Sequence, residues 1–360
     1  MSIPKRLKVK SNIRDYSVLF IDDFSEAIVD ESLEATSHFI IDQSFCHLYH
    51  DQIQSILQLE RCLVVEATEK HKTLEYVQVV IEFLLSNNIK RGNRLIGIGG
   101  GIIQDIVGFI SSILFRGIDW VFYPTTLLAQ CDSCIGSKSS INVGEFKNQL
   151  GTFHPPERIM LDVKVLKTLS PVEISSGIGE IIKVHLLDGA DSLEYITSHF
   201  DAGSRPDFDV IRDLIERSLE IKKAIIEKDE LDRDYRNILN YGHTFGHAIE
   251  SITNYQVCHG QAVTMGMDIA NYISLRLGIL SNEFFNLMRI PIMGNYPDFH
   301  LEKEYVDQLL MALSKDKKNV DENLSAILTK GPGEMLKMKL PFDDNLKLYI
   351  IDYIGSVGSA

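Results

Sequence analysis

The chain has 360 residues, 45% of them hydrophobic, and its 50 acidic and 36 basic side chains give a formal net charge of −14. This composition excludes a disordered chain, and the acidic balance argues against a general nucleic-acid binder, which needs surplus Lys and Arg. The apolar stretches are too short to span a bilayer, and no apolar segment follows the basic N-terminus as a signal peptide requires. Five sparsely spaced cysteines suggest reduced thiols, so we expect a cytoplasmic protein without a membrane partner.

The first half alternates strand-like and helix-like segments. Apolar runs predict strands at 16–21, 38–42, 62–66, 94–98 and 120–123. Helical spacing is found at 43–59, at 74–87 and from about residue 102. Strands that alternate with helices indicate a largely parallel sheet with helices on its faces.

From Ser170 the pattern becomes helical. Ser170-Pro171-Val172-Glu173 has the N-cap serine, early proline and third-position glutamate of a capping box. Helical periods follow at 211–227, 237–251, 261–277 and 305–313. We therefore expect an α/β domain over 1–169, an all-α domain over 170–360, and a substrate bound between them, since binding sites favour domain interfaces.

A glycine-rich turn, Gly97-Ile98-Gly99-Gly100-Gly101, joins a predicted strand to a predicted helix. Glycines let the backbone approach a pyrophosphate, and a helix N-terminus offers free N–H groups, although Ile102 breaks a strict GxGxxG spacing. Thr125 and Thr126 follow another predicted strand and supply hydroxyls at a matching sheet edge. A plain tight turn and two helix-capping threonines are the simpler alternatives.

Four polar residues, Arg236, Asn240, His243 and His247, have offsets of 0, 4, 7 and 11, which place them on one stripe of a continuous helix. A solvated face is the simpler alternative. The residues between them form no compensating apolar face, so the stripe is predicted to face a polar ligand.

A metal site is predicted from His243, His259 and an acidic third residue, because Zn²⁺ binds imidazole nitrogen and carboxylate oxygen and keeps an open position when catalytic. Glu180 is the acidic candidate, and it shares a helix face with Lys183. A plain intrahelical ion pair is the alternative for these two residues.

The loop over 130–142, continued by Lys147-Asn148, holds small residues, hydroxyls and lysines, which suit an anionic group. The rival interpretation is Cys131-x-x-Cys134 as a redox or metal pair, although no second CxxC exists. Cys258 beside His259 would be a nucleophilic pair only exceptionally, since sequence neighbours rarely form such a dyad.

Taken together, these segments resemble the sugar-phosphate cyclases, and the 3-dehydroquinate synthase family most closely. The resemblance extends from about His38 to Lys318 and includes a short Glu69-x-x-Lys72 motif. Its most specific blocks are GGGIIQDIVGF (99–109), FRG (115–117), PTTLLAQCDS (124–133), KNQLGTF (147–153), LKTLSPVEISSGIGEIIK (166–183), RNILNYGHTFGHAIE (236–250) and HGQAVTMGM (259–267).

The resemblance implies a homodimeric cyclase that needs NAD and Zn²⁺ or Co²⁺. A Rossmann-like α/β domain with a mainly parallel sheet (1–169) would bind NAD, and the all-α domain (170–360) would bind the metal and the substrate. NAD would contact Asp42, Glu69, Lys72, Gly100, Gly101, Asp105, Thr125, Thr126, Leu166 and Thr168, with Lys147 at the junction between cofactor and substrate. The metal would be bound by Glu180, His243 and His259.

The resemblance also assigns the substrate residues. The catalytic set would be Asp132, Lys138, Lys183, Lys222, Arg236, Asn240 and His247, and the further binding set Arg116, Asn148 and Lys317. Arg116, Lys138, Asn148 and His247 would hold the phosphate, Arg236, Asn240 and Lys317 the carboxylate, and Asp132 and Lys183 the ring hydroxyls. Arg116 would reach a neighbouring subunit's pocket.

The implied reaction turns 3-deoxy-arabino-heptulosonate 7-phosphate into 3-dehydroquinate and phosphate by transient oxidation, β-elimination, re-reduction and intramolecular aldol closure. Such a cyclase could feed aromatic amino acids through the shikimate pathway, or a secondary product. Arg236 and Asn240 favour this carboxylate over the alternatives, sedoheptulose 7-phosphate and glucose 6-phosphate. A glycerol-dehydrogenase-type oxidoreductase would not need the basic set, and a non-catalytic metabolite-binding relative would not need the ligands and bases.

Three departures from the family pattern stand out. Asp42-Gln43-Ser44 replaces Asp-x-Asn, Gly136-Ser137-Lys138-Ser139 replaces Gly-Gly-Lys-Thr, and Cys131 and Cys134 replace valine and serine. The second lies beside a substrate lysine and leaves the exact sugar phosphate open.

Overall fold

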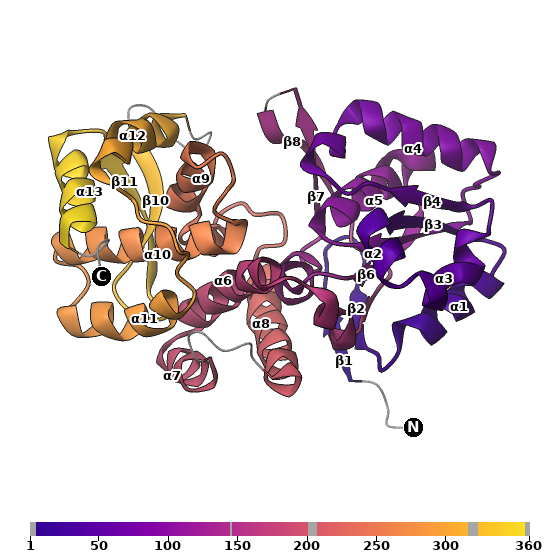
Figure 1. Ribbon diagram of the computed structural model, residues 1–360, viewed down its shortest axis with the longest axis horizontal. Helices are drawn as coiled ribbons and strands as arrows, with labels where there is room; N and C mark the ends of the chain where they lie inside the picture. The colour runs from indigo at the N-terminus through magenta and orange to yellow at the C-terminus, as the bar shows by residue number, and fades with distance from the viewer. Residues whose placement is uncertain (1–4, 145, 201–206, 316–322, 357–360) are drawn as a thin grey trace. The chain divides into compact units, whose positions relative to one another are not determined.

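The computed structural model of the protein describes residues 5–144, 146–200, 207–315 and 323–356, which belong to two compact units (Figure 1). Unit 1 comprises Met1–Leu169 and Lys222–Leu231, and unit 2 comprises Ser170–Ile221 and Asp232–Ala360. The short segment Lys222–Leu231 therefore counts with unit 1, although it lies within the sequence range predicted for the second domain.

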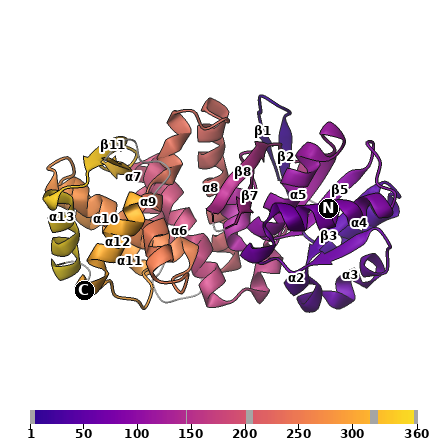
Figure 2. The ribbon, with the colours of Figure 1, turned by 90° about the horizontal axis from the view of Figure 1, so that it is seen from above.

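A seven-stranded sheet forms the middle of unit 1. Its order is β1-β2-β9-β6-β5-β3-β4, and every neighbouring pair is parallel except β1–β2, an antiparallel hairpin visible in Figure 2. The strands are β1 (Arg6–Val9), β2 (Tyr16–Phe20), β3 (Ser37–Asp42), β4 (Cys62–Val65), β5 (Arg94–Gly99), β6 (Asp119–Pro124) and β9 (Arg158–Leu161). The predicted mainly parallel sheet is confirmed, whereas β1 and β9 were not predicted.

Helices cover both faces of this sheet. In Figure 1, α4 (Leu74–Ser86) and α5 (Gly101–Ile113) lie on one side of β3 and β4, and α1–α3 lie on the other. The latter are α1 (Phe24–Leu33), α2 (Gln43–Leu48) and α3 (His50–Leu57). The segment predicted as one helix over 43–59 is divided between α2 and α3, because Tyr49 departs from helical geometry (φ −124°, ψ 25°).

Strand interiors are apolar on both sides, as a parallel sheet between two helix layers requires. Phe39, Ile40 and Ile41 in β3 are all fully buried, and burial of each such side chain stabilises the fold by about 1.5–3 kcal/mol. The short helices η1 (Glu69–His71), η2 (Leu114–Arg116), η3 (Ala129–Ser133) and η4 (Val163–Thr168) lie in the connections. A separate antiparallel hairpin, not predicted, pairs β7 (Lys138–Val143) with β8 (Phe146–Phe153).

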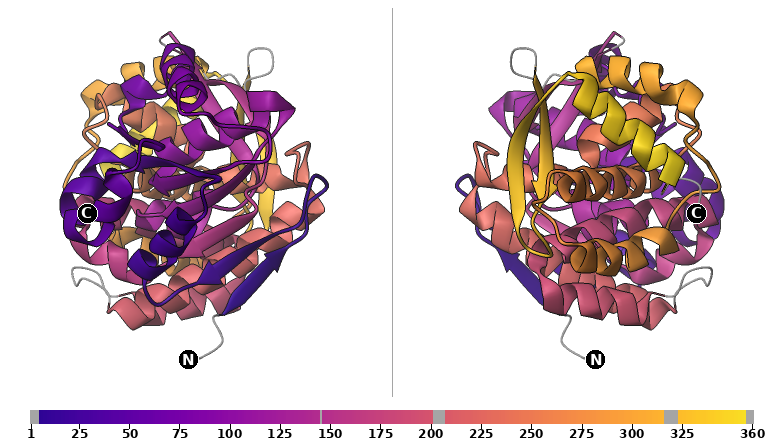
Figure 3. Two further views of the ribbon diagram at one scale, coloured as in Figure 1. Left: turned by 90° about the vertical axis from the view of Figure 1, so that its right-hand side faces the viewer. Right: turned by 90° about the vertical axis from the view of Figure 1, so that its left-hand side faces the viewer.

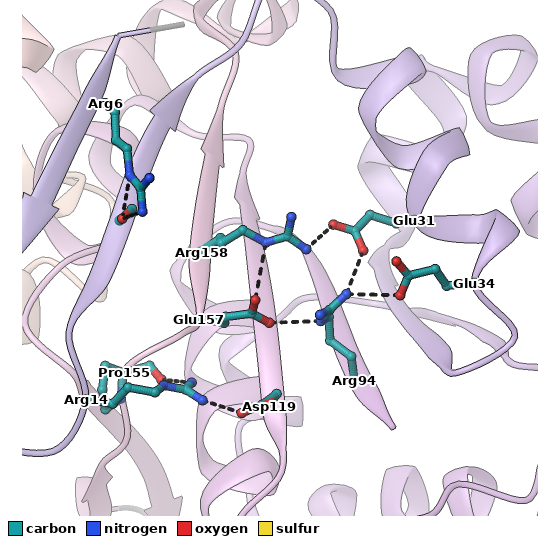
Figure 4. A network of polar contacts seen from close by, with 10 residues as sticks. Arg6, Arg14, Glu31, Glu34, Arg94, Asp119, Pro155, Glu157 and Arg158 are labelled. Atoms are coloured by element: carbon teal, nitrogen blue, oxygen red, sulfur yellow. Dashed lines mark hydrogen bonds and ion pairs between the residues drawn. The ribbon is translucent and has the colours of Figure 1, made fainter. Parts of the chain in front are cut away.

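An ion-pair network joins α1 to the amino ends of β5 and β9 (Figure 4). Arg94 Nε lies 3.0 Å from Glu157 Oε2, Arg94 Nη1 lies 3.4 Å from Glu31 Oε2, and Arg158 Nη2 lies 2.9 Å from Glu31 Oε1. Burial raises the pKa of Glu31, and the positive charges of Arg158 and Arg94 only partly counteract this increase. The network stabilises the edge of the sheet opposite the carboxyl ends of the parallel strands.

Unit 2 is mainly helical, as predicted. Its helices are α6 (Pro171–Asp188), α7 (Ala190–His199), α8 (Phe208–Lys228), η5 (Tyr235–Asn240), α9 (His243–Ile252), α10 (His259–Arg276), α11 (Asn282–Gly294), η6 (Lys303–Tyr305), α12 (Val306–Ser314) and α13 (Asp344–Ser356), with the last turns of α8 in unit 1. The capping box at Ser170 and Glu173 forms as predicted. Helix α10 is the centre of the unit, since every residue from 262 to 274 is buried.

The helical unit also contains one hairpin, which was not predicted. Strand β10 (Asn323–Thr329) pairs antiparallel with β11 (Met335–Pro341) beside the helices, as the right-hand view of Figure 3 shows. The alternation of Lys337 and Lys339 with apolar residues was a period-two signal for this strand. Within the described ranges, no helix is both long enough and apolar enough to cross a membrane.

The prediction of one continuous helix over 237–251 is wrong. The segment contains η5, a turn at Gly242 and then α9. Gly242 has φ +77°, and a Cβ there would lie 2.6 Å from the carbonyl oxygen of Val263, so glycine ends one helix and permits the next. Arg236 and Asn240 in η5 therefore do not share a helical stripe with His243 and His247 in α9.

Candidate active site

Three predicted metal ligands meet inside unit 2. Glu180 of α6 places Oε1 at 3.5 Å from Nε2 of His243 and at 3.3 Å from Nε2 of His259. One ligand atom from each residue lies within 4.8 Å of the others. The glutamate is only 2% exposed, so the cluster lies on a buried carboxylate.

Glycines explain why the helices that carry these ligands can come so close. Gly179 precedes Glu180 in α6 and Gly260 follows His259 in α10. A Cβ on Gly179 would lie 2.0 Å from the carbonyl oxygen of Gly260, and a Cβ on Gly260 would lie 1.8 Å from that of Ser176. The two backbones therefore touch, and their contact brings the carboxylate to the imidazole.

Both histidines are oriented through their other ring nitrogen. Nδ1 of His243 lies 3.2 Å from the carbonyl oxygen of Tyr241, and Nδ1 of His259 lies 3.3 Å from Oε1 of Glu250. Donation from each Nδ1–H fixes the ring so that Nε2 faces Glu180, as in metal-binding histidines with an outer carboxylate or carbonyl partner. Glu250 was missed from the sequence, although His243, His247 and Glu250 have helical offsets of 0, 4 and 7 in α9.

The cluster fits a divalent metal ion. Burial opposes the charged form of Glu180, but Lys183 and His259 outweigh it and hold the pKa of this carboxyl well below its usual range. The ion pair of Lys183 with Glu180 Oε2 keeps the ligand ionised, as metal binding requires. Oε1 is buried yet has no hydrogen-bond partner among the described residues. One carboxylate and two imidazoles form the donor set of a zinc site with an open position.

His247 joins this cluster, whereas two further predicted residues lie just before it in the chain. The His247 ring centroid is 5.3 Å from that of His243 and 6.0 Å from that of His259. Arg236 is buried in η5, and Asn240, the last residue of η5, donates from Nδ2 to the carbonyl of Asn237 (3.1 Å).

The predicted cofactor residues of unit 1 gather at one edge of the sheet. The chain runs from β3 outward to β4 and then back past β3 to β5, so the strand order reverses between β3 and β5. In such sheets ligands bind outside the carboxyl ends of the strands at this point of reversal. Asp42 ends β3, Gly99 ends β5, and Gly100 caps α5 while Gly101 begins it.

Close contacts join this edge to the next strand. A Cβ on Gly99 would lie 2.4 Å from Ile103 Cγ1 and 3.2 Å from Asp42 Cβ, so no larger residue fits. The amide of Thr125 donates to Gly99 O (2.9 Å), and Thr126 packs against Gly100. Thr126 Oγ1 also accepts a hydrogen bond from the amide of Ala129, which supports the helix-capping alternative for this threonine. Leu166 and Thr168 lie in η4, after β9, where the hydroxyls of Tyr49 and Thr168 are 3.3 Å apart.

A polar network surrounds Lys72. Its buried Nζ donates to Asp105 Oδ2 (3.0 Å) and to Asn148 Oδ1 (2.7 Å), and it lies 3.5 Å from Glu69 Oε1. Burial raises the pKa of Asp105, although Lys72 and Ser140 counteract this effect. The structure thus joins three predicted cofactor residues to Asn148, which was predicted to bind the substrate phosphate.

Comparison with known proteins settles the family. Residues 62–176 match the family described as 3-dehydroquinate synthase N-terminal, and residues 177–319 match 3-dehydroquinate synthase C-terminal. The 3-dehydroquinate synthase of Alkaliphilus metalliredigens is 35% identical over 319 residues, covering 88% of this chain and 89% of that protein. The enzyme of Thermoanaerobacter sp. is 34% identical over 349 residues, covering 93% and 97%. The chain belongs to the 3-dehydroquinate synthase family. The predicted enzyme class, an NAD- and metal-dependent phosphate-eliminating cyclase, is confirmed with it.

Solved structures share the fold of this family member. A 2-deoxy-scyllo-inosose synthase complexed with carbaglucose-6-phosphate, NAD⁺ and Co²⁺ superposes with a TM-score of 0.84 at 23% identity, covering 97% of this chain and 99% of that one. A 2-epi-5-epi-valiolone synthase from Streptomyces hygroscopicus with NAD⁺ and Zn²⁺ bound gives 0.80 at 23% identity, covering 96% and 97%. A probable glycerol dehydrogenase from Sinorhizobium meliloti gives 0.58 at 13% identity, covering 94% and 97%, so it has a similar fold.

Further residues that the 3-dehydroquinate synthase family implies for the site lie in unit 1. Lys222, in the last two turns of α8, donates from Nζ to the carbonyl of Asp132 (2.6 Å) and lies 3.0 Å from its carboxylate. Lys138 begins β7 and is exposed, and it follows Asp132 closely in the sequence. Lys147, on β8, is exposed as well.

Arg116 is separate from these residues. It lies in η2, three residues before β6 begins, and so at the amino end of a strand whose carboxyl end leads to Thr125. The structure does not bring Arg116 together with the other predicted substrate residues of unit 1. Lys317 lies outside the described residues.

The cysteine alternatives find no support. Cys131 and Cys134 are unbridged and each 1% exposed, and burial raises the pKa of Cys134 to about 12, so its thiolate is strongly disfavoured. Cys258 contacts Gln261 Oε1 (3.2 Å), whereas His259 faces Glu180 and Glu250.

Proposed function

We propose that the protein converts 3-deoxy-arabino-heptulosonate 7-phosphate into 3-dehydroquinate and inorganic phosphate. The observation that carries this proposal is the cluster of Glu180, His243 and His259, a buried carboxylate faced by two oriented imidazoles. It occurs in a chain that is about a third identical to named 3-dehydroquinate synthases over most of its length.

The metal would be bound by this cluster. A divalent ion there supplies a Lewis acid that lowers the pKa of a substrate hydroxyl. Lys183 keeps Glu180 ionised, and the hydrogen bonds at Nδ1 direct Nε2 of His243 and His259 toward the same point. Lys183 would also hold a ring hydroxyl of the substrate.

NAD would bind at the carboxyl edge of the sheet in unit 1, where it supplies the hydride acceptor. The free N–H groups at the start of α5, around Gly100 and Gly101, would face the pyrophosphate. Thr125, Thr126, Leu166, Thr168 and the network of Lys72, Glu69 and Asp105 would line the remainder, with Asp42 at the adenosine end and Lys147 toward the substrate.

The remaining predicted residues would hold the substrate. Lys138, Asn148 and His247 would bind its phosphate and Asp132 a ring hydroxyl, with Lys222 fixing the Asp132 carboxylate. Buried Arg236, with Asn240 and Lys317, would bind the carboxylate by charge-assisted hydrogen bonds.

We also propose that the enzyme works as a cytoplasmic homodimer. Arg116 lies at the amino edge of its own sheet, opposite the proposed cofactor edge. Its contact with a substrate phosphate would therefore be made in the pocket of a second copy.

A second candidate is a cyclase for sedoheptulose 7-phosphate or glucose 6-phosphate. It is favoured by one observation, the high fold similarity to two cyclases of which one was solved with carbaglucose-6-phosphate. The buried arginine in η5 favours the carboxylate-bearing substrate instead.

One experiment separates the candidates. Purified enzyme with NAD and Zn²⁺ is incubated with each of the three sugar phosphates, and phosphate release is followed together with dehydroquinate formation. We expect turnover with 3-deoxy-arabino-heptulosonate 7-phosphate. Phosphate release only from sedoheptulose 7-phosphate or glucose 6-phosphate would replace the first candidate by the second.

A further inference from the structure

Ser137 has an unusual backbone conformation for its residue type. Its φ of +65° lies in the left-handed region that favours glycine, so a serine is strained there. Ser137 is nevertheless 6% exposed, and its hydroxyl donates to Oε1 of Glu230 at 2.7 Å. Glu230 is itself 2% exposed, so this is a buried hydrogen bond to a carboxylate, a strong kind of contact.

Further hydrogen bonds fix the same turn. The amide of Gly136 donates to the hydroxyl of Tyr16 (2.9 Å), and the carbonyl of Ser137 accepts the amide of His154 (2.7 Å). On the far side, the hydroxyls of Ser139 and Thr152 are 2.7 Å apart. Lys138 is therefore the exposed side chain between two buried serines.

The segment Lys222–Leu231 holds both ends of the loop that leads to this lysine. Lys222 binds the carbonyl and the carboxylate of Asp132, at 2.6 and 3.0 Å. Eight residues later, Glu230 binds Ser137 through Oε1 and the amide of Asn12 through Oε2 (2.6 Å). These contacts belong entirely to unit 1 and explain why the segment counts with it.

We propose that Ser137 and Glu230 are positioning residues that set Lys138 for the phosphate of the substrate. This inference rests on the proposed function, because it assumes that Lys138 binds a phosphate. The hydroxyl of Ser137 offsets the strain of the left-handed turn, and its partner Glu230 ties the turn to the segment Lys222–Leu231. Loss of the bond frees the turn to relax and moves the ammonium away from its place, and small misplacements of a binding group cost much of its effect.

Ser137→Ala is the first test, because it removes the hydroxyl and keeps the strain. We expect KM for the sugar phosphate to rise about tenfold, kcat to change less than about twofold, and the Kd of NAD to stay unchanged. Ser137→Gly removes both the hydroxyl and the strain, so KM should rise less than in Ser137→Ala. The matched control is Ser139→Ala, which removes an equally buried hydroxyl that bonds within the hairpin rather than to Glu230.

A double-mutant cycle with Glu230→Gln isolates the contact. If the two residues act together, Ser137→Ala in the Glu230→Gln background should raise KM by less than about twofold. Independent, multiplicative effects on KM would overturn the proposal, as would an unchanged KM in Ser137→Ala.

Two readouts need no turnover and separate this inference from the proposed function. Hydrogen exchange of the amides over 132–140 should be faster in Ser137→Ala than in Ser139→Ala, and the Kd of inorganic phosphate should rise about tenfold. If no sugar phosphate is turned over, the substrate proposal fails while these two measurements still decide the role of Ser137. Unchanged exchange and unchanged phosphate binding would refute it.

Discussion

The two histidines of the metal cluster are oriented by different kinds of partner. A backbone carbonyl, that of Tyr241, holds His243, and a carboxylate, that of Glu250, holds His259. Mutation can remove the carboxylate but not the backbone carbonyl. A substitution of Glu250 therefore tests whether the orientation of His259 matters for metal binding. Outer partners of this kind fix the tautomer of a histidine and raise its basicity.

Glu250→Ala is expected to lower the affinity for Zn²⁺ about ten- to a hundredfold, because His259 loses the acceptor that orients it. Competition with a chromophoric chelator measures this change in the purified protein. The control is Glu220→Ala, an exposed glutamate of α8. Equal Zn²⁺ affinity in the two variants would show that Glu250 does not orient the ligand.

His243→Ala removes one of the proposed metal ligands. We expect turnover to be abolished and bound zinc to be lost, while the far-UV circular dichroism stays that of the parent because the ring is partly exposed at the edge of α9. Activity that survives this change would show that the metal is bound elsewhere.

At the residue scale, the sequence predicted the ligand types but not the residues that hold them. Glu180, His243 and His259 were identifiable because few residue types bind zinc. Glu230 was not, because its role depends on a hydrogen bond to Ser137, 93 positions away in the chain.

Among the elements, the crossing of α6 and α10 decides whether a metal site exists. The crossing depends on two glycines whose missing side chains let the backbones touch. It also places Glu180 and His259 side by side, each adjacent to one of these glycines.

Gly179→Ala is therefore expected to destabilise the protein by about 1–3 kcal/mol or more and to weaken Zn²⁺ binding more than tenfold, because the new Cβ meets the Gly260 carbonyl. Urea denaturation and a zinc titration measure the two effects. Gly92→Ala is the control, since nothing lies within 4 Å of a Cβ there. A Gly179→Ala variant with parental stability and zinc affinity would show that the helices need no such contact.

Most strands and helices could be predicted because their periodicity is local. The strands β3, β5 and β6 each contain a short apolar run, and α4 and α10 repeat at helical spacing. The break at Gly242 could not be predicted, because the segment keeps a helical period while the close approach of Val263 and Met267 demands a glycine turn. The β7–β8 hairpin was missed because it is mostly polar and largely exposed on β8.

For the whole molecule, the acidic net charge of −14 contrasts with the basic side chains assigned to the proposed site. The cations assigned to cofactor and substrate are Lys72, Arg116, Lys138, Lys147, Lys183, Lys222, Arg236 and Lys317. The net charge of the chain therefore does not predict the electrostatic field at a site, because that field is set by the nearest charged groups.

Buried histidines make overall stability depend on pH. His185 of α6 is fully buried, and burial lowers its pKa to about 4 despite the hydrogen bond of Nδ1 to the Ile181 carbonyl. The unfolded chain binds this proton near pH 6.5. Between about pH 6.5 and 4 the unfolded state therefore holds more protons, and this contribution to stability is lost as the pH falls.

His185→Gln should remove that contribution. The difference in unfolding free energy between the parent and the variant is expected to grow by about 1.4 kcal/mol per pH unit from pH 4 toward 6.5 and to be constant above pH 7. Urea denaturation at several pH values measures it, with His300→Gln as the control for loss of an exposed histidine. A pH-independent difference would refute the assignment.

The chain passes between the two units three times, after Leu169, after Ile221 and after Leu231. A gene fragment that ends at residue 169 would encode Asp132 and Ser137 without Lys222 and Glu230, the partners that hold them. A single recombination point between two relatives would likewise combine the loop of Asp132 and Ser137 with a foreign anchoring segment. A chimera of this chain with a relative therefore needs to transfer residues 222–231 together with the first 169.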